Sequence, residues 1–212
     1  MANIKAYETG FKELYFQVLD EDGKTLKTIP GLDKLEDAED GANAFRRLRG
    51  AKSLTSTDES NQSGVLADDD PNYLILSAST ATSGSLTVVG ITDEFKVAVL
   101  GYSVDSFGNV INLEAKPRLC HLMFTRTTHK GTERVILYNV QFTANDNLDV
   151  QTGTENEPNA ALDFTVHGIK VKAGNATKTL KMYKIKDTDE RYATVLTEGA
   201  PTEITLADAL EQ

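Results

Sequence analysis

Short runs in which apolar and polar residues alternate dominate the chain, and they predict β-strands rather than long helices. The clearest run covers residues 134–142, where apolar residues recur at every second position. This period of two places them on one face of a strand, so a single apolar stripe is predicted. The stripe consists of Ile136, Tyr138, Val140 and Phe142. Together with residues 118–126 and the turn sequence His129-Lys130-Gly131, the run predicts a β-hairpin.

Further strands are predicted from the same alternation and from the turn residues between the runs. Asp22-Gly23 lies between two apolar runs, so a hairpin is predicted from residues 12–20 and 24–29. In residues 160–171 the apolar phase shifts by one position at Gly168, which predicts a bulge there. The remaining strands are expected at 52–57, 73–79, 85–91, 179–185 and 192–196.

Two segments have helical signals. Thr92 is a predicted N-cap, and Asp93 and Glu94 follow in the first turn, where the helix dipole favours negative charge. The next apolar residues share one helical face and Gly101 supplies a stop, so a helix is predicted at about residues 93–100. The sequence Thr205-Leu206-Ala207-Asp208 resembles a capping box and predicts a short C-terminal helix at about 205–210.

Residues 32–72 differ in character from the rest of the chain. They are rich in Asp, Glu, Ser, Thr and Gly and poor in large apolar residues. Long stretches of this kind are uncommon inside compact domains and are usually functional or disordered, so an extended arm or loop is predicted there. The chain, 1–212, is accordingly predicted to be one mainly β domain: an antiparallel β-sandwich with one flanking α-helix and this polar arm.

Charge and cysteine content narrow the functional classes. The 32 acidic and 22 basic residues give a net charge of −10 at pH 7, which disfavours binding to nucleic acid or to anionic lipid. Cys120 is the only cysteine, so an intrachain disulfide is excluded. Residues 1–10 lack the apolar core of a signal peptide, and no run of about 18 apolar residues occurs. We therefore expect the protein to be made and kept in the cytoplasm.

Motifs with catalytic chemistry are weak. The sequence Gly101-Tyr102-Ser103-Val104-Asp105 resembles half of a nucleophile elbow, but the closing glycine is missing and a helix is expected before it. We interpret it as a turn. His121, His129 and His167 are isolated in the sequence and are interpreted as surface or strand-face residues. Because distant residues can meet in space, a hydrolase with a spatially assembled site stays open as an alternative.

Signals for metal, thiol and phosphate chemistry are equally weak. Asp20-Glu21-Asp22-Gly23 and residues 145–149 have a calcium-like composition, but neither continues as an EF-hand loop, so turns are the better interpretation. Cys120 lies in an alternating run and is predicted to be a small core residue. The basic cluster Arg46-Arg47-Leu48-Arg49 follows the acidic run 36–40, which favours ion pairing within or between subunits. We predict no enzyme, no cofactor and no catalytic, cofactor-binding or metal-ligating residue.

An ordered set of short motifs resembles the major tail proteins of siphophages, which form the tail tube. Each motif is weak alone, and it is their order over roughly residues 54–169 that carries the resemblance. In chain order the motifs are Leu54-Thr55-Ser56-Thr57, residues 67–73, residues 84–88, Asp93-Glu94-Phe95, Leu100-Gly101, residues 105–110, Lys116-Pro117-Arg118, Tyr138, Glu155 and Leu162-Asp163-Phe164.

The resemblance implies a function as well as a fold. It implies hexameric rings that stack into the tail tube of a long-tailed bacteriophage, a conduit for DNA ejection. The implied partners are further copies of this chain, in ring and ring-to-ring contacts, and the tape measure, tail terminator and distal tail proteins. DNA would pass without specific binding, and no membrane partner is implied. The implied location is the virion tail, after a stage in the host cytoplasm.

The acidity of the chain suits such a conduit. An acidic wall repels the phosphates of a passing duplex from all sides, whereas a basic wall would bind them. Asp163 and the acidic connector at 146–158 are the candidate wall residues.

Two other classes remain open at this stage. One is an immunoglobulin-like binding or adhesion module, and the other is a different tail component such as a terminator. Electron microscopy of the purified protein distinguishes them, because rings or tubes favour the tail tube and a monodisperse monomer favours a binding module.

Overall fold

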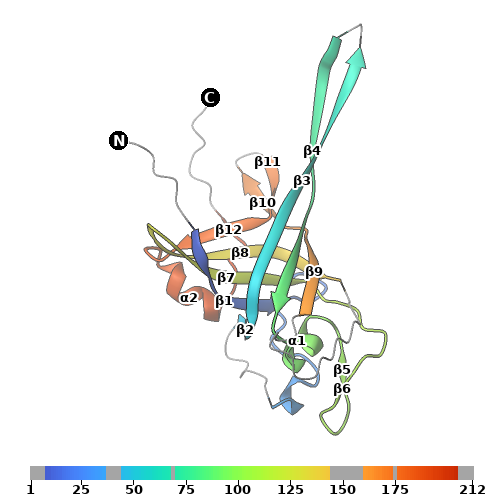
Figure 1. Ribbon diagram of the computed structural model, residues 1–212, viewed down its shortest axis with the longest axis vertical. Coiled ribbons are helices and arrows are strands. Elements are labelled where there is room, and N and C mark those ends of the chain that lie inside the picture. Colours follow the sequence, from blue (N-terminus) through green and yellow to red (C-terminus); the bar gives the residue numbers. More distant parts are fainter. Residues whose placement is uncertain (1–7, 37–43, 68–69, 144–159, 174–175, 205–212) are drawn as a thin grey trace, which may run out of the picture.

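Antiparallel β-structure makes up most of the computed structural model, which describes residues 8–36, 44–67, 70–143, 160–173 and 176–204 (Figure 1). The main sheet has the strand order β2-β1-β7-β8-β9-β4-β3, and β12 pairs with β8 outside this path. The predicted mainly β, antiparallel fold class is confirmed. The strands of this sheet are β1 (Glu8–Val18), β2 (Arg46–Leu48), β3 (Ala51–Ala67), β4 (Asp70–Val88), β7 (Cys120–Thr128), β8 (Gly131–Phe142), β9 (Ala160–Val166) and β12 (Met182–Lys186).

Two small hairpins and three short helices accompany the main sheet in the described ranges. Strand β5 (Ser103–Val104) pairs with β6 (Val110–Ile111), and β10 (Ile169–Ala173) pairs with β11 (Ala176–Leu180). The helices are a 3-10 turn η1 (Leu32–Lys34), α1 (Asp93–Ala98) and α2 (Arg191–Glu198). In Figure 1, α1 and the β5–β6 hairpin lie at one end of the molecule, and β3 and β4 project from the opposite end.

Alternate residues of the central strands supply two apolar cores. On β7, Leu122 belongs to the main core and its neighbour Met123 to the second core, because successive side chains of a strand point to opposite faces. The main core contains residues of β1, β4, β7, β8, β9 and α1. The second core brings residues of β7, β8 and β12 together with Val195 of α2. Both faces of β7 and β8 are therefore covered.

A chain of aromatic rings runs through the main core. The ring of Phe95, on α1, packs edge to face against the rings of Phe16 on β1 and Phe142 on β8. The distances between ring centres are 5.2 Å and 5.3 Å. Phe142 in turn contacts Phe164 of β9 at 5.7 Å. Edge-to-face packing at these distances is favourable beyond the area that it buries. Phe95 thereby ties the helix to two strands of the main sheet, β1 and β8.

Helix α1 begins where the sequence predicts it. The Thr92 side chain caps the first turn, since its Oγ1 accepts a hydrogen bond from the Phe95 backbone N–H at 3.3 Å. The helix ends at Ala98, two residues before the predicted end at 100. A left-handed residue, Gly101, follows with a φ of 80°.

The β7–β8 hairpin is confirmed, but the single apolar stripe predicted on β8 is wrong. Asn139 has a φ of 49°, and the register between β7 and β8 slips beside it. The extra residue of such a bulge reverses the faces of the side chains that follow. Ile136 and Tyr138 accordingly enter the second core, whereas Val140 and Phe142 enter the main core. The neighbour of β8 also changes at this point, from β12 to β9.

The predicted strand at 160–171 divides into two. Strand β9 ends at Val166, and β10 begins at Ile169 in a separate hairpin. Gly168, between them, has a φ of 75°, and a Cβ atom there would lie 2.7 Å from the backbone oxygen of Leu180. The predicted bulge is therefore a turn of the chain between two sheets, at a position that only glycine fits without strain.

The hairpin predicted from 12–20 and 24–29 forms only its turn. The Asp20 backbone N–H donates to the Lys24 carbonyl at 2.8 Å, and a single bridge joins Leu19 to Thr25. Strand β1 takes β7 as its long neighbour instead, from Glu8 to Val18. Neighbouring residues determine the turn, whereas long-range packing determines which strand pairs with β1.

The strand predicted at 192–196 is wrong, because this segment lies in helix α2. Tyr192, Val195 and Leu196 have the i, i+3, i+4 spacing of one helical face, and all three pack in or against the second core. Arg134 of β8 anchors the helix, since its guanidinium donates to the Tyr192 carbonyl and lies 4.2 Å from the Tyr192 ring centre.

Much of the predicted polar arm at 32–72 is β-structure. The segment contains η1, β2, all of β3 and the start of β4, and the short strand expected at 52–57 is part of the longer β3. The strands predicted at 73–79 and 85–91 are one strand, β4, with no turn between them. Ser and Thr are compatible with a paired strand, so polarity alone does not make a loop. The predicted C-terminal helix at 205–210 lies outside the described residues.

Candidate assembly surfaces

The paired strands β3 and β4 form a hairpin that extends well beyond the rest of the molecule (Figure 1). They pair from Ala51↔Val88 near the sheet to Ala67↔Asp70 at the far end. Strand β9 supports only the near part of β4, along the seven residues 82–88. We call the unsupported remainder, 59–67 and 70–81, the distal hairpin.

The distal hairpin has free backbone edges on both sides. Within the described ranges, β3 pairs with no strand other than β4, and residues 70–81 of β4 pair only with β3. Each free edge presents N–H and C=O groups that are able to pair with another chain. A long exposed edge of this kind is a surface for association by strand addition.

The distal hairpin begins at the point where β9 stops pairing with β4. The β3–β4 register slips between Asp58 and Ser60, next to Thr82, where the pairing of β4 with β9 ends. A bulge bends and twists a strand at such a point. Close to it, a Cβ atom on Gly84 would lie 2.4 Å from the ring of Phe164, so glycine lets this ring pack directly on the β4 backbone.

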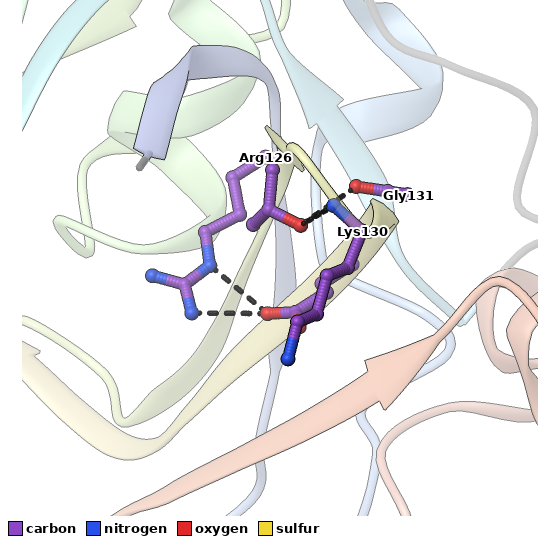
Figure 2. A network of polar contacts seen from close by, with 5 residues as sticks. Arg126, Lys130 and Gly131 are labelled. Atoms are coloured by element: carbon purple, nitrogen blue, oxygen red, sulfur yellow. Dashed lines mark hydrogen bonds and ion pairs between the residues drawn. The ribbon is translucent and has the colours of Figure 1, made fainter. Parts of the chain in front are cut away.

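A second feature is the tight turn between β7 and β8, in which His129 and Lys130 are exposed (Figure 2). The Arg126 guanidinium pairs across the two strands with the Glu133 carboxylate at 2.9 Å. In the turn, Thr128 Oγ1 accepts from the Lys130 N–H at 3.2 Å and donates to the Gly131 carbonyl at 3.1 Å. The ion pair and these two hydrogen bonds hold the turn in one conformation.

A third feature is the turn at 105–109, between β5 and β6. One oxygen of the Asp105 carboxylate accepts from the backbone N–H groups of Phe107 and Asn109, each at 2.8 Å, and the other from Asn109 Nδ2 at 2.9 Å. The hydrogen bonds from Asn109 are the main cause of a lowered Asp105 pKa, so this carboxylate stays charged. Phe107 is 89% exposed, the most exposed large apolar side chain in the described residues.

A shallow depression of about 300 Å³ lies where β1, β2 and the start of β3 meet. Leu14 and Leu48 are among its lining residues, although their side chains are buried in the main core, and charged residues surround them. Three of these are cationic and only Glu13 is acidic, which makes the depression locally basic on an acidic protein. The cationic residues are Lys12, Arg47 and Arg49.

The basic cluster of the sequence is divided between this depression and the interior. Arg46 Nη1 and the Glu94 Oε1 of α1 form a buried ion pair at 2.7 Å, with 10% and 4% of the two side chains exposed. Arg47 lies 3.6 Å from the Glu13 carboxylate on the surface. The predicted ion pairing within a subunit is therefore confirmed for Arg46 and Arg47, although the acidic partners lie on β1 and α1. The acidic run 36–40 lies largely outside the described residues.

His121 forms part of the buried polar structure around the β8 bulge. Its Nδ1 accepts from the Asn139 backbone N–H at 3.1 Å, and Asn139 Nδ2 donates to the Gly168 carbonyl at 2.8 Å. Burial lowers the pKa of His121 to about 4, from an ordinary value near 6.5. The neutral imidazole thus serves as a hydrogen-bond acceptor at the point where β8 changes partners.

This arrangement predicts a loss of stability on mild acidification. Because the pKa of His121 is lower in the fold than in the unfolded chain, the unfolded chain takes up the proton first. The stabilisation is complete above about pH 6.5 and is lost as the pH falls towards 4, by up to about 3 kcal/mol in the free energy of unfolding. Urea titrations between pH 7 and 4.5 measure this loss.

The matched control separates His121 from the carboxylates that also titrate in this range. The variant His121→Asn keeps an acceptor near the Nδ1 position but cannot be protonated, so its stability is expected to fall less steeply with pH. The variant His129→Asn changes an exposed histidine and is expected to keep the wild-type slope. Equal slopes for wild type and His121→Asn would contradict the assignment.

The other candidate residues of the sequence have structural surroundings. Cys120 is fully buried, and burial raises its pKa, in agreement with the predicted core role. The turn predicted at 101–105 is wrong in part, because Gly101 is left-handed, with a φ of 80°, but Ser103 and Val104 form the strand β5, and the turn follows at 105–109. His167 is exposed, as is Asp163 on β9. Asp20 accepts from the Lys24 N–H, as a turn residue does.

Comparison with known proteins adds no family to this description. No family model matches the sequence, and no curated protein matches it.

Among the described residues, no group of three or more His, Cys, Asp or Glu side chains is placed to hold a metal ion. None of the helices in the described ranges is long and apolar enough to cross a bilayer. The residues at 145–149 and the connector at 146–158 lie outside the described residues.

Proposed function

We propose that this chain is a structural virion protein that polymerises as stacked hexameric rings into the tail tube of a long-tailed bacteriophage. The observation that carries the proposal is the distal hairpin, whose two strands leave the sheet and present free backbone edges. Its sequence contains part of the ordered motifs that resemble siphophage major tail proteins, including residues 67–73.

The free edges favour closed assembly over a stable monomer. An unpaired strand invites association, and a ring of identical subunits satisfies every edge without leaving one over. The hairpin extends far enough from the sheet to lie against another subunit rather than its own (Figure 1). Strand addition supplies backbone hydrogen bonds, which do not depend on large apolar side chains.

The charge of the chain supports a conduit for DNA. A net charge of −10 repels phosphate, and duplex DNA carries one negative charge per about 1.7 Å of its axis. A wall of the same sign keeps a passing duplex centred and prevents tight binding. Asp163 is exposed on β9 and remains a candidate for this wall. In the assembled tube, a lumen lined mainly by Lys and Arg would contradict the mechanism.

Self-assembly of the purified protein tests the proposal. We expect rings or tubes in electron micrographs at high protein concentration, and more of them as salt is raised, because salt screens the repulsion between acidic subunits. Light scattering follows the same transition in solution. A protein that stays monomeric at every salt concentration, and with tail partners present, would refute the tail-tube proposal.

A further inference from the structure

We propose that the turn at 105–109 of one copy, which carries Phe107, docks into the depression of a second copy that is lined by Lys12, Arg47 and Arg49. This head-to-tail contact joins neighbouring subunits. The inference rests on the proposed function, because it names a surface through which the assembly forms. It concerns two features that no strand pairing explains: an exposed aromatic side chain and a hollow lined by cationic residues.

The turn has the properties of a rigid anchor. Phe107 is 89% exposed, although a phenyl ring gains free energy by leaving water. The three hydrogen bonds to Asp105 already hold the loop, so docking costs little additional ordering. Aromatic anchors that enter a pocket are the side chains that dominate many interfaces.

The depression offers complementary chemistry. The depression, about 300 Å³ in volume, is open at the surface, and because Leu14 and Leu48 beneath it are buried in the main core, its exposed lining is mainly charged. Lys12 and Arg49 are exposed there, so they are able to approach the face of a phenyl ring and the Asp105 carboxylate beside it. The turn, with its Asp105 carboxylate, is therefore complementary in charge to the depression, which is locally basic on a protein with a net negative charge.

A second copy is the occupant that best fits these observations. The turn and the depression belong to different parts of the surface, one beside α1 on the β5–β6 hairpin and the other on β1 and β2. A contact between two different patches of identical chains is heterologous, so each copy keeps one free turn and one free depression. Such contacts close into rings when the rotation between copies permits.

Cross-linking tests the contact directly. Cys120 is fully buried, so cysteines introduced at exposed Ser106 and Lys12 are the reactive thiols; the variant replaces Lys12, but Phe107, Asp105 and Arg49 of the proposed contact stay in place. With a short bis-maleimide, the double variant Ser106→Cys/Lys12→Cys is expected to give a ladder of covalent oligomers. An equal mixture of the two single variants is expected to stop at dimers, and each single variant alone to stay largely monomeric.

An assembly measurement provides the second readout. Phe107→Ser is expected to raise the protein concentration needed for assembly at least about tenfold. Leu113→Ser, which changes another exposed apolar residue (67% exposed), is expected to have no such effect. Lys12→Glu/Arg49→Glu is expected to act like Phe107→Ser, whereas Lys184→Glu/Lys186→Glu on β12 is not.

The outcomes separate this contact from the proposed function. If tubes form but the ladder is absent and Phe107→Ser assembles like wild type, the docking contact is wrong and the tail-tube proposal stands. If the ladder forms without rings or tubes, the contact is supported and the tail-tube proposal fails. If neither ladder nor rings appear, both are refuted.

Discussion

Removal of the distal hairpin is expected to abolish assembly while the rest of the protein stays folded. In the variant, Asn-Gly replaces residues 59–81 and joins Asp58 to Thr82, which are paired across the two strands. The seven residues of β4 that pair with β9 remain, as do both cores. The removed parts of β3 and β4 pair only with each other in the described structure, so no strand of the remaining sheet loses its partner.

Two measurements check this result. The thermal midpoint of the shortened protein is expected to stay within about 4 °C of wild type, which corresponds to roughly 1 kcal/mol for a chain of this size. Electron microscopy is expected to show no rings or tubes under conditions in which wild type forms them. Normal assembly of the shortened protein would show that the hairpin is not an assembly element.

A half-length variant is the matched control for the new turn. Here Asn-Gly replaces residues 63–76, between the paired residues Gln62 and Ser77, so the same turn is present on a longer hairpin. Its folding stability is expected to match that of the full deletion. If assembly depends on the length of the free edges, the half-length variant assembles at a higher protein concentration than wild type.

Truncation of Phe95 is expected to cause the largest loss of folding stability. Its ring is fully buried and sits between Phe16 and Phe142 in the main core. Phe95→Ala is therefore expected to lower the free energy of unfolding by about 3–5 kcal/mol, through lost burial and the cavity left behind. The thermal midpoint falls by roughly 10 °C as a result.

The same substitution at the surface is the control. Phe107→Ala removes an identical side chain that is 89% exposed, and its effect on folding stability is expected to stay within about 0.5 kcal/mol. Denaturant unfolding of the two variants and wild type at one pH compares them. Equal stability of Phe95→Ala and Phe107→Ala would mean that α1 does not hold the main core together.

Features set by neighbouring residues are predictable from the sequence. The cap at Thr92 and the acidic first turn place α1 correctly, because a helix start depends on a few adjacent side chains and N–H groups. The β7–β8 hairpin follows from two alternating runs and the turn between them. The core position of Cys120 follows from the same alternation.

The long hairpin shows where local pattern stops being sufficient. Apart from the short strand predicted at 52–57, the polar sequence up to residue 67 looks like a loop, because a strand without an apolar face has no period of two to reveal it. Pairing with β4 decides its structure, and β4 itself is continuous over a region in which two strands are predicted. The motif resemblance points to this region, but the shape and the free edges of the assembly surface come only from the fold.

The remaining differences have the same physical origin. Whether 192–196 is strand or helix depends on the second core that Val195 enters, and that core exists only after β7, β8 and β12 have met. The bulge at Asn139 and the burial of His121 beside it likewise depend on contacts between distant segments. The sequence by itself determined the strand-rich class, the acidic charge and the local turns and caps, since these depend on backbone preference and composition. Only the tertiary structure decided which strands pair, which faces are buried and which edges stay free, because those follow from long-range packing.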